Sequence, residues 1–376
     1  MGKFYVLRDV YLPGAAPINR MLSFLRGFEE MGVDTEVVFF MPDKDRSKVN
    51  STLYKHISFT YLWDSSSFSG RYSKYILGYL NALKFRQRLK SGDKVLMLGS
   101  VFPDILYGKR GVSYYQEHTE HPAVIPFYMV PFDKNRKRVI HYINKSDGLF
   151  VISTALKEFF SSKGMDEEKI HIVNMTVDSN RFEGVAKEKV PFPYIAYCGT
   201  ASNNKDGVDE LIKAFAIVNK NYPKYKLYII GDTPSEEDLS GNYALVKRLG
   251  VQNSVVFTGR VLSDKIPQLL KNAQILALDR PDSLQAQNGF PTKLGEYLLT
   301  ENPVVVTKVG DIPKFLTDGE TALLAKERNS DDFASKIIWA IRNPEKASDI
   351  GKAGAKVALK YFNYQTESKK IWTIIK

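Results

Sequence analysis

The apolar positions along the N-terminal part of the chain alternate between two patterns. Runs such as KFYVLRDV, TEVVFF, KVLMLG and VSYYQE have the length and composition of buried strands. Between them, NRMLSFLRGFEEMG, YSKYILGYLNALKFRQRLKSG and ALKEFFSSKG carry apolar residues at helical spacing. We interpret HYINKSDGLFVIS as a helix end that leads into the next helix, and KIHIVNM as the last strand. Strands that alternate with helices predict a parallel sheet covered by helices on both faces.

The alternation stops at EGVAKEKVPFP, residues 183–193, and then starts again. YIAYCG, KLYIIG, SVVFTG, QILALD and PVVVT are the strands predicted after this break, with helices such as VDELIKAFAIVNKNY between them. We therefore predict an α/β protein with two Rossmann-like, doubly wound domains, 1–186 and 187–361, and a C-terminal helix at about 362–376 that packs back on the first domain. Since ligands bind at the carboxyl ends of strands in such sheets, we expect the domains to face each other across a cleft.

Three strand ends of the second half are followed by glycine, in YCGT, IIGD and FTGR. Glycine allows a ligand to approach the backbone closely, although it also ends many strands for reasons of turn geometry alone. The dinucleotide fingerprint G-x-G-x-x-G is absent after each of these strands, which argues against a nicotinamide or flavin dehydrogenase.

The segment QNGFPTKLGEYLLTENPVVVT, residues 287–307, combines a loop, a helix start, a helix and a strand. Lys293 and Glu296 are three residues apart and share a helical face, so one interpretation is a surface helix with a Lys–Glu pair. The other is a ligand at the helix N-terminus, with the amides of Gly289 and Phe290 around a phosphate and Glu296 accepting hydrogen bonds from ribose hydroxyls. Lys205 in SNNKDG would add a positive charge to the same phosphates, unless it is only a solvated loop lysine.

Composition places these domains in an ordinary globular protein with an excess of positive charge. The 376 residues carry a formal net charge of +11, and the single cysteine, Cys198, excludes a disulfide within the chain and fits a reducing compartment. No apolar run approaches the ~18 residues needed to span a membrane. The first strand begins almost at Met1, so we expect no signal peptide and a cytoplasmic location.

The positive charge is concentrated in the first domain. Between residues 70 and 111 only Asp93 and Asp104 oppose the basic residues Arg71, Lys74, Lys84, Arg86, Arg88, Lys90, Lys94, Lys109 and Arg110. A second basic cluster, KNRKR at 134–138, follows the aromatic run IPFYMVPF. Such regions bind an anionic membrane surface or nucleic acid, or are solvated faces without a partner.

The ordered motifs resemble one family. GTASNNKDGVDELIKAFAIV, KLYIIGD, VVFTGRV and NGFPTKLGEYLLTENPVVVTKVGDIPKFLTDGETALLA resemble the C-terminal domain of the GT-B glycosyltransferases of family 4. The turn NMTVD before Arg-Phe, and the N-terminal LPGAAPINRMLSFLRGFEEMGVDTEVVFF, are similar to earlier segments of that family. The resemblance implies retaining transfer of a sugar from a nucleotide diphosphate donor, bound by the C-terminal domain, to an acceptor hydroxyl at the N-terminal domain.

Two positions depart from the family pattern. Of the two glutamates usually found with seven residues between them, Glu296 matches the second, whereas the first position holds Asn288. The usual lysine is matched by Lys205, whereas Thr200 stands in the place of an arginine. The leaving diphosphate would then depend on Lys205, which makes this residue a catalytic candidate. The donor-binding residues predicted in this way are Gly14, Ala15, Gly199, Thr200, Lys205, Gly231, Arg260, Val261, Asn288, Gly289, Phe290, Pro291, Lys293 and Glu296.

The N-terminal domain contributes candidates from YYQEHTEHP, residues 114–122. His118 stands where the family often has a histidine that faces the transferred sugar, and Glu117 and Glu120 flank it and could orient an acceptor hydroxyl or take its proton. His118 and Glu120 therefore join Lys205 as catalytic candidates, with a histidine satisfied by loop hydrogen bonds as the alternative. Gly14 and Ala15 in YLPGAAP are small enough for the backbone to approach the donor phosphates. No Asp-x-Asp motif follows a strand, so we expect no metal or other cofactor.

We therefore predict a glycosyltransferase that uses a nucleotide sugar and a lipid-linked or polysaccharide acceptor, located on an anionic membrane surface. Asn288 and Thr200 keep open a non-catalytic GT-B subunit or sugar-binding partner, and a nucleotide-sugar epimerase on the same architecture is a further alternative. A nucleic-acid-binding protein is disfavoured, because no nucleic-acid-binding module is recognisable.

Overall fold

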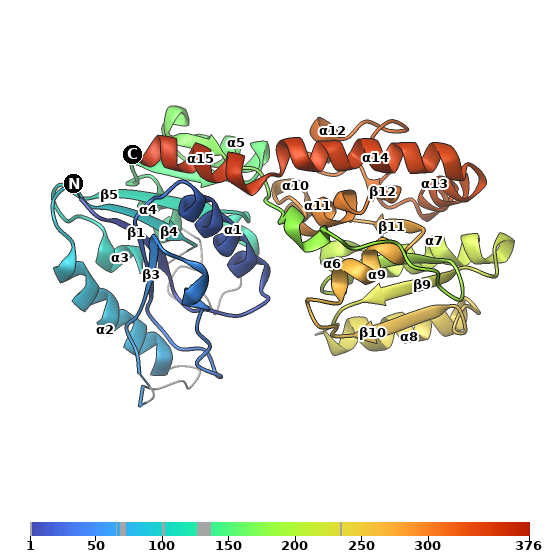
Figure 1. Ribbon diagram of the computed structural model, residues 1–376, viewed down its shortest axis with the longest axis horizontal. Coiled ribbons are helices and arrows are strands. Elements are labelled where there is room, and N and C mark those ends of the chain that lie inside the picture. The colour runs from blue at the N-terminus through green and yellow to red at the C-terminus, as the bar shows by residue number, and fades with distance from the viewer. Residues whose placement is uncertain (1, 65, 68–72, 100–101, 126–136, 234) are drawn as a thin grey trace. The chain divides into compact units, whose positions relative to one another are not determined.

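The computed structural model describes residues 2–64, 66–67, 73–99, 102–125, 137–233 and 235–376 (Figure 1). Arg71 and most of the aromatic and basic stretch at 125–138 lie outside these residues. The chain forms two compact units: unit 1 contains residues 1–176 and 364–376, and unit 2 contains residues 177–363. None of the helices in the described residues is both long enough and apolar enough to cross a membrane.

Unit 1 contains a seven-stranded parallel sheet within the described residues, in the order β3-β2-β1-β4-β5-β6-β7. The strands are β1 (Phe4–Arg8), β2 (Thr35–Phe39), β3 (Ile57–Tyr61), β4 (Lys94–Leu98), β5 (Ser113–His118), β6 (Gly148–Val151) and β7 (Ile170–Ile172). The helices are α1 (Ala16–Glu30), α2 (Ser73–Arg88), α3 (Pro103–Leu106), α4 (Lys137–Ile143), α5 (Thr154–Ser162) and α15 (Tyr364–Ile375).

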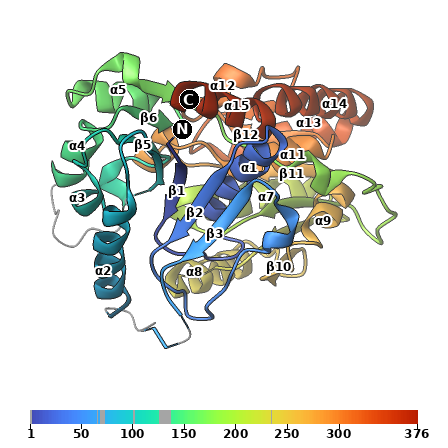
Figure 2. The ribbon, with the colours of Figure 1, turned by 60° about the vertical axis from the view of Figure 1, so that its left-hand side comes forward.

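The sheet of unit 1 has an apolar core on each face, because side chains alternate along its strands. Phe4 and Val6 of β1 belong to a core shared with α1 and α15, and Tyr5 and Leu7 belong to a core shared with α2 and α3. The helix α15 lies along α1 (Figures 1 and 2).

Unit 2 repeats this design with a six-stranded parallel sheet, again counted over the described part of the chain, in the order β10-β9-β8-β11-β12-β13. The strands are β8 (Tyr194–Cys198), β9 (Lys226–Ile230), β10 (Val255–Gly259), β11 (Ile275–Leu278), β12 (Val304–Thr307) and β13 (Leu323–Ala325). The helices are α6 (Asn203–Asp206), α7 (Val208–Asn221), α8 (Glu236–Arg248), α9 (Ile266–Asn272), α10 (Leu284–Asn288), α11 (Thr292–Leu299), α12 (Ile312–Phe315), α13 (Ser330–Arg342) and α14 (Pro344–Tyr361).

These two parallel sheets with flanking helices confirm the predicted α/β class and the two doubly wound halves. In each sheet the strand order reverses at one point, between β1 and β4 and between β8 and β11. Ligands of open α/β sheets bind at the carboxyl ends of the strands beside this reversal. The cleft between the domains and the domain roles stay predictions.

Candidate functional site

Two glycines allow close packing at the carboxyl end of β8. Gly199 has φ +152°, and its N–H donates to the carbonyl of Ile230 at 2.8 Å. A Cβ on Gly199 would overlap the ammonium group of Lys293, and a Cβ on Gly231 would overlap the carbonyl of Gly199. The φ angle of Gly199 and the close backbone contact of Gly231 therefore require glycine at both positions, whatever ligand the site binds.

Lys293, in the first turn of α11, points into this strand end. Its ammonium group forms an ion pair with the carboxylate of Asp206 on α6, donates to the Tyr197 hydroxyl at 3.0 Å, and lies 4.7 Å from the centroid of the Tyr197 ring. The Asp206 side chain is only 2% exposed. Burial opposes its ionisation, but the charge of Lys293 and hydrogen bonds from Lys293 and Tyr197 hold the pKa of Asp206 below its usual value.

Glu296, one turn later on α11, pairs with a different residue. Its carboxylate forms an ion pair with Arg181 of the 3-10 turn η5 (Ser179–Phe182), and the Arg181 guanidinium also donates to the carbonyl of Ser263 at 3.0 Å. Burial raises the pKa of Glu296, and the charge of Arg181 opposes this shift. The interpretation of a surface Lys–Glu pair is therefore wrong: the two side chains share a helical face but have separate partners.

Two further charged residues follow β11 directly and were not identified from the sequence. Asp279 and Arg280 are 1% and 3% exposed. Burial, reinforced by the carboxylates of Glu210 and Asp209, raises the pKa of Asp279 to about 8. Arg280 is close enough for its positive charge to lower the pKa of both Lys293 and Asp206. A signal was visible in the sequence, since QILALDRPD places two charges immediately after an apolar strand.

The buried charges at this strand end leave an excess of positive charge. Lys293 and Arg280 are cationic, Asp206 is anionic, and Asp279 is largely neutral at pH 7 because of its raised pKa. Lys205, the neighbour of Asp206 on α6, is exposed and its charge also lowers the pKa of Lys293. This arrangement is suited to an anionic group.

The remaining strand-end candidates lie around this cluster. Thr200 has an exposed side chain, and its carbonyl accepts a hydrogen bond from the Tyr197 hydroxyl at 2.7 Å. Arg260 is exposed and Val261 is half-buried just after β10, which is two strands away from β8 in the sheet. The structure therefore places Thr200 beside Lys293 and its partners, and Arg260 and Val261 farther along the sheet edge.

The loop before α11 differs in one respect from the expected phosphate cradle. The N–H of Gly289 donates to the carbonyl of Gln285 at 2.9 Å and so completes the short helix α10. One of the two amides assigned to a phosphate is therefore already used. Pro291 is the N-cap residue of α11. The Phe290 ring is buried, and its centroid lies 5.5 Å from that of Phe315 and 5.3 Å from that of Phe362. Asn288 is also buried, and its amide donates to the carbonyl of Leu284 at 2.9 Å.

In unit 1, His118 ends β5 and is 5% exposed. Its Nε2 lies 3.1 Å from Oε1 of Gln116, and burial lowers the pKa of His118 to about 4. The imidazole is therefore neutral near pH 7. His121 lies in the following turn, where its Nδ1 accepts from the N–H of Ala123 at 3.1 Å, and Glu120 is half-buried.

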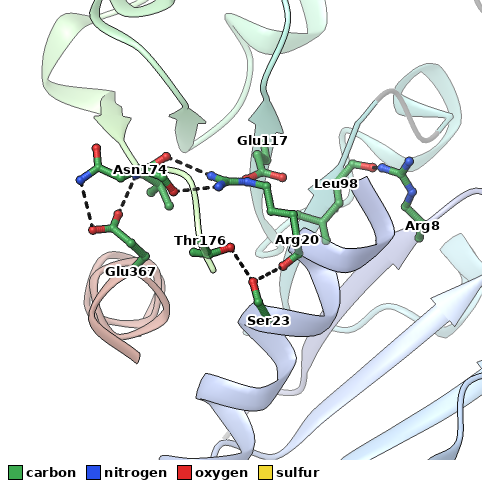
Figure 3. Close-up of polar contacts among 9 residues, drawn as sticks. Arg8, Arg20, Ser23, Leu98, Glu117, Asn174, Thr176 and Glu367 are labelled. Atoms are coloured by element: carbon green, nitrogen blue, oxygen red, sulfur yellow. Dashed lines mark hydrogen bonds and ion pairs between the residues drawn. The ribbon is translucent and has the colours of Figure 1, made fainter. Parts of the chain in front are cut away.

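Glu117 has a structural partner. Its carboxylate pairs with Arg20 of α1 at 2.7 Å, and the Arg20 guanidinium also donates to the carbonyls of Asn174 at 2.7 Å and Val173 at 2.9 Å (Figure 3). Both side chains are buried, so this ion pair joins α1 to β5 and to the chain after β7.

Gly14 and Ala15 lie in the loop between β1 and α1. Gly14 is exposed with φ +79°, and Ala15 is the N-cap residue of the 15-residue helix α1. Within the part of the chain that the structure describes, no group of three or more histidine, cysteine, aspartate or glutamate side chains is placed to hold a metal ion.

The chain is similar to proteins of one family. Residues 178–357 match the family model described as glycosyl transferases group 1. Mannosylfructose-phosphate synthase of Agrobacterium fabrum is 22% identical over 307 residues, 77% of this chain and 65% of the relative. A GDP-mannose-dependent phosphatidylinositol monomannoside mannosyltransferase of Mycolicibacterium smegmatis is 23% identical over 67% of each chain. The aligned parts span about two thirds of these relatives, and less than half of a plant sulfoquinovosyl transferase from Arabidopsis thaliana.

Solved structures with the same fold cover nearly the whole chain. Anabaena HepE in complex with UDP-glucose has a TM-score of 0.74 at 17% identity, covering 99% of this chain and 98% of that one. Sucrose-phosphate synthase from Thermosynechococcus elongatus has a TM-score of 0.76 at 13% identity, covering 100% and 98%. This likeness shows that the chain has the GT-B fold, and residues 178–357, within unit 2, match the glycosyl transferases of group 1.

Proposed function

We propose that the chain is a retaining glycosyltransferase of the family 4 type, which moves a sugar from a nucleotide diphosphate sugar to an acceptor hydroxyl. The observation that carries this proposal is the buried cationic cluster of Lys293 and Arg280, next to Glu296, inside the segment that matches the family model. A leaving diphosphate is stabilised by fixed positive charge in a site that excludes water. Structures of HepE contain UDP and UDP-glucose, which supports a donor of this class.

In this proposal each unit 2 candidate has a separate role. Lys205 is the exposed cation that meets the diphosphate at the rim of the buried cluster. Glu296 accepts hydrogen bonds from the ribose hydroxyls, and Asn288 contacts hydroxyls of the transferred sugar. The N–H of Phe290 faces the phosphates, and no metal ion is required because protein cations neutralise the leaving group.

Unit 1 supplies the acceptor side of the reaction. His118, neutral because of its lowered pKa, offers a hydrogen bond to the sugar, and Glu120 orients the acceptor hydroxyl and takes its proton. Gly14 and Ala15 allow the backbone to approach the donor. We propose a lipid-linked or polysaccharide acceptor at the cytoplasmic face of the cell membrane, because unit 1 carries the basic region around α2.

A non-catalytic GT-B subunit is the second candidate, and Asn288 and Thr200 are the observations that favour it. Thermal unfolding with UDP, GDP and ADP identifies the nucleotide, since a ligand that binds the folded state raises the unfolding temperature. Sugars linked to that nucleotide are then assayed for release of the free nucleotide, with and without glycan acceptors.

The variants for this assay are Lys205→Ala and Glu296→Gln, with Lys224→Ala as the control. Lys224 is an equally exposed lysine before β9, at the opposite edge of the sheet. We expect Lys205→Ala to lower turnover by about a hundredfold, and Lys224→Ala to leave it unchanged. A nucleotide that stabilises the chain without release of free nucleotide from any sugar donor would favour the non-catalytic subunit. No thermal response to any nucleotide would refute both the glycosyltransferase and the non-catalytic subunit.

A further inference from the structure

A short chain of hydrogen bonds runs through the interior of unit 1 and ends at His118. Gln116 and His118 lie two residues apart on β5, so their side chains point to the same face of the sheet. Glu117, between them, points the other way, to Arg20 (Figure 3). The Gln116 amide donates to the Tyr107 hydroxyl at 2.5 Å, and its Oε1 lies 3.1 Å from Nε2 of His118. Gln116 therefore connects the Tyr107 hydroxyl to the imidazole.

Burial makes these hydrogen bonds necessary. Gln116 and His118 are both buried, and Tyr114, on the same face of β5, belongs to the apolar core shared with α2 and α3. A buried amide without partners is costly, so Gln116 is held where both of its polar ends are used. The Tyr107 ring stacks on that of Tyr114, with the centroids 4.7 Å apart. The hydroxyl that binds the amide is therefore itself fixed by packing.

This chain determines which ring nitrogen of His118 carries the proton. Because burial lowers the pKa of His118 to about 4, the imidazole is neutral near pH 7 and has a single N–H group. The nitrogen of the Gln116 amide only donates, and its oxygen only accepts. Since the nitrogen binds Tyr107, the oxygen faces Nε2 of His118, and only a protonated Nε2 forms a hydrogen bond with it. Nδ1 is then the nitrogen without a proton.

The opposite tautomer would lose this hydrogen bond. With the proton on Nδ1, the lone pairs of Nε2 and of Oε1 on Gln116 would face each other in a buried place. A loss of this kind favours the Nε2–H form by about tenfold or more. Among the residues that the structure describes, Nδ1 of His118 has no hydrogen-bond partner. This nitrogen therefore accepts a hydrogen bond from a ligand and cannot donate one.

We propose that Gln116 is a positioning residue that holds His118 as the Nε2–H tautomer, so that Nδ1 accepts a hydrogen bond from a hydroxyl group of the ligand. His118 lies at the carboxyl end of β5, the end at which ligands of such sheets bind. An unprotonated nitrogen attracts a hydroxyl and repels the oxygens of a phosphate or a carboxylate. The inference rests on the proposed function in one respect, because that function supplies the sugar hydroxyl.

The test is ¹⁵N NMR of the full chain with ¹⁵N-labelled histidine at pH 7, without any donor. Protonated and unprotonated nitrogens of a neutral imidazole have well-separated ¹⁵N chemical shifts, so the spectrum reports the tautomer directly. The signals of His118 are those that disappear in His118→Gln. We expect a protonated Nε2 and an unprotonated Nδ1. A protonated Nδ1, or the two tautomers in equal amounts, would overturn the inference.

Variants of Gln116 separate the effect of its oxygen from a general loosening of the core. Gln116→Leu removes the acceptor and should raise the ratio of the Nδ1–H to the Nε2–H form of His118 by about tenfold. Gln116→Glu keeps an acceptor oxygen and should retain a protonated Nε2. An unchanged ratio in Gln116→Leu, or the same change in both variants, would overturn the role of Gln116.

The matched control is Gln274→Leu in unit 2. The oxygen of Gln274 accepts a hydrogen bond from the N–H of Tyr194 at 2.7 Å, so this variant also removes a glutamine that is hydrogen-bonded beside a strand. It should leave the His118 signals unchanged. A change in the control as large as that in Gln116→Leu would overturn the inference, because the tautomer would then respond to any loss of stability.

Turnover in the nucleotide-sugar assay tests the consequence for the ligand. Gln116→Leu should lower kcat by about fivefold, and it should add no further loss to His118→Gln, because both changes act through the same imidazole. Additive losses would overturn the inference. The Nε2–H tautomer in a chain that responds to no nucleotide overturns the donor site alone, whereas the Nδ1–H tautomer beside an intact nucleotide response overturns the role of Gln116 alone.

Discussion

The buried ion pair between Lys293 and Asp206 gives the sharpest test of the site. Lys293→Met keeps the length of the side chain but removes the ammonium group. The Asp206 carboxylate, 2% exposed, then remains in the interior of unit 2 with Tyr197 as its nearby hydrogen-bond donor. The charge of Arg280 still acts on the Asp206 carboxylate, but the ion pair is lost. A buried carboxylate that has lost its paired cation is costly, so the variant should be destabilised although no apolar contact is lost.

The size of this effect follows from the exposure of the two partners. Removing one member of a buried ion pair costs about 3–5 kcal/mol. The Lys293 side chain is 15% exposed, so some water reaches the pair and the lower end applies, about 3 kcal/mol. For a unit of this size each kcal/mol lowers the unfolding temperature by about 2–4 °C, which predicts a decrease of about 6–12 °C.

The assay is urea and thermal unfolding of Lys293→Met, Asp206→Asn and the double variant at pH 7. Because the double variant has no buried charge at this pair, it should be more stable than Lys293→Met, with a coupling energy of about 2 kcal/mol. The lowered pKa of Asp206 means that its contribution is present above about pH 4 and is lost as the pH falls through the folded-state value. A loss below about 1 kcal/mol in Lys293→Met, or a double variant no more stable than this single variant, would refute the reasoning.

Three further predictions follow from the same geometry. The pKa of His118 is about 4 in the folded chain and ~6.5 when unfolded. The unfolded chain therefore binds more protons between these values, and the free energy of unfolding falls by up to about 3 kcal/mol as the pH drops through this range. Urea titrations of His118→Gln should show a smaller dependence of this free energy on pH. The dependence of stability on pH has the opposite sign for Asp279, because its pKa of about 8 means that the folded chain binds more protons. The free energy of unfolding therefore falls as the pH rises from ~4 to about 8, and Asp279→Asn should be more stable than the unmodified chain at pH 8. Arg181→Gln removes the ion-pair partner of Glu296 and should weaken nucleotide binding about tenfold in thermal-shift titrations. Arg181→Lys should restore part of the affinity, and the exposed control Arg248→Gln should leave it unchanged. An unchanged affinity in Arg181→Gln would show that Glu296 needs no partner.

Much of the fold was predictable because buried parallel strands are near-continuous apolar runs. YIAYC, KLYII and VVVT were identified in this way. Two strands were missed for physical reasons. The edge strand β3 is only partly buried, so ISFTY mixes polar and apolar residues. The strand β6 has only four residues, GLFV, and begins five residues after the end of α4, so its short apolar run was interpreted as part of a helix.

The site was less predictable because its partners are distant in the sequence. Spacing placed Lys293 and Glu296 on one face of α11, but Asp206 lies 87 residues from the first and Arg181 lies 115 residues from the second. Helical periodicity says nothing about contacts of this kind. The Gly289 N–H, which was expected to bind a phosphate, instead donates to the carbonyl of Gln285, because α10 ends at Asn288 and this hydrogen bond closes its last turn.

The two departures from the family pattern differ in what the structure offers in their place. Where Thr200 stands instead of the expected arginine, Arg280 and Lys293 place two buried cations near the end of β8. Asp206 is the anionic partner of Lys293, and Asp279 is largely protonated near pH 7. Positive charge therefore lies at the end of β11 and the start of α11 in this chain. At Asn288 a neutral amide, tied to Leu284, stands in the place of the glutamate. On the proposed function, the donor site would attract a diphosphate but lack a negative charge beside the sugar, so we expect the sugar, more than the nucleotide, to distinguish this chain from its relatives.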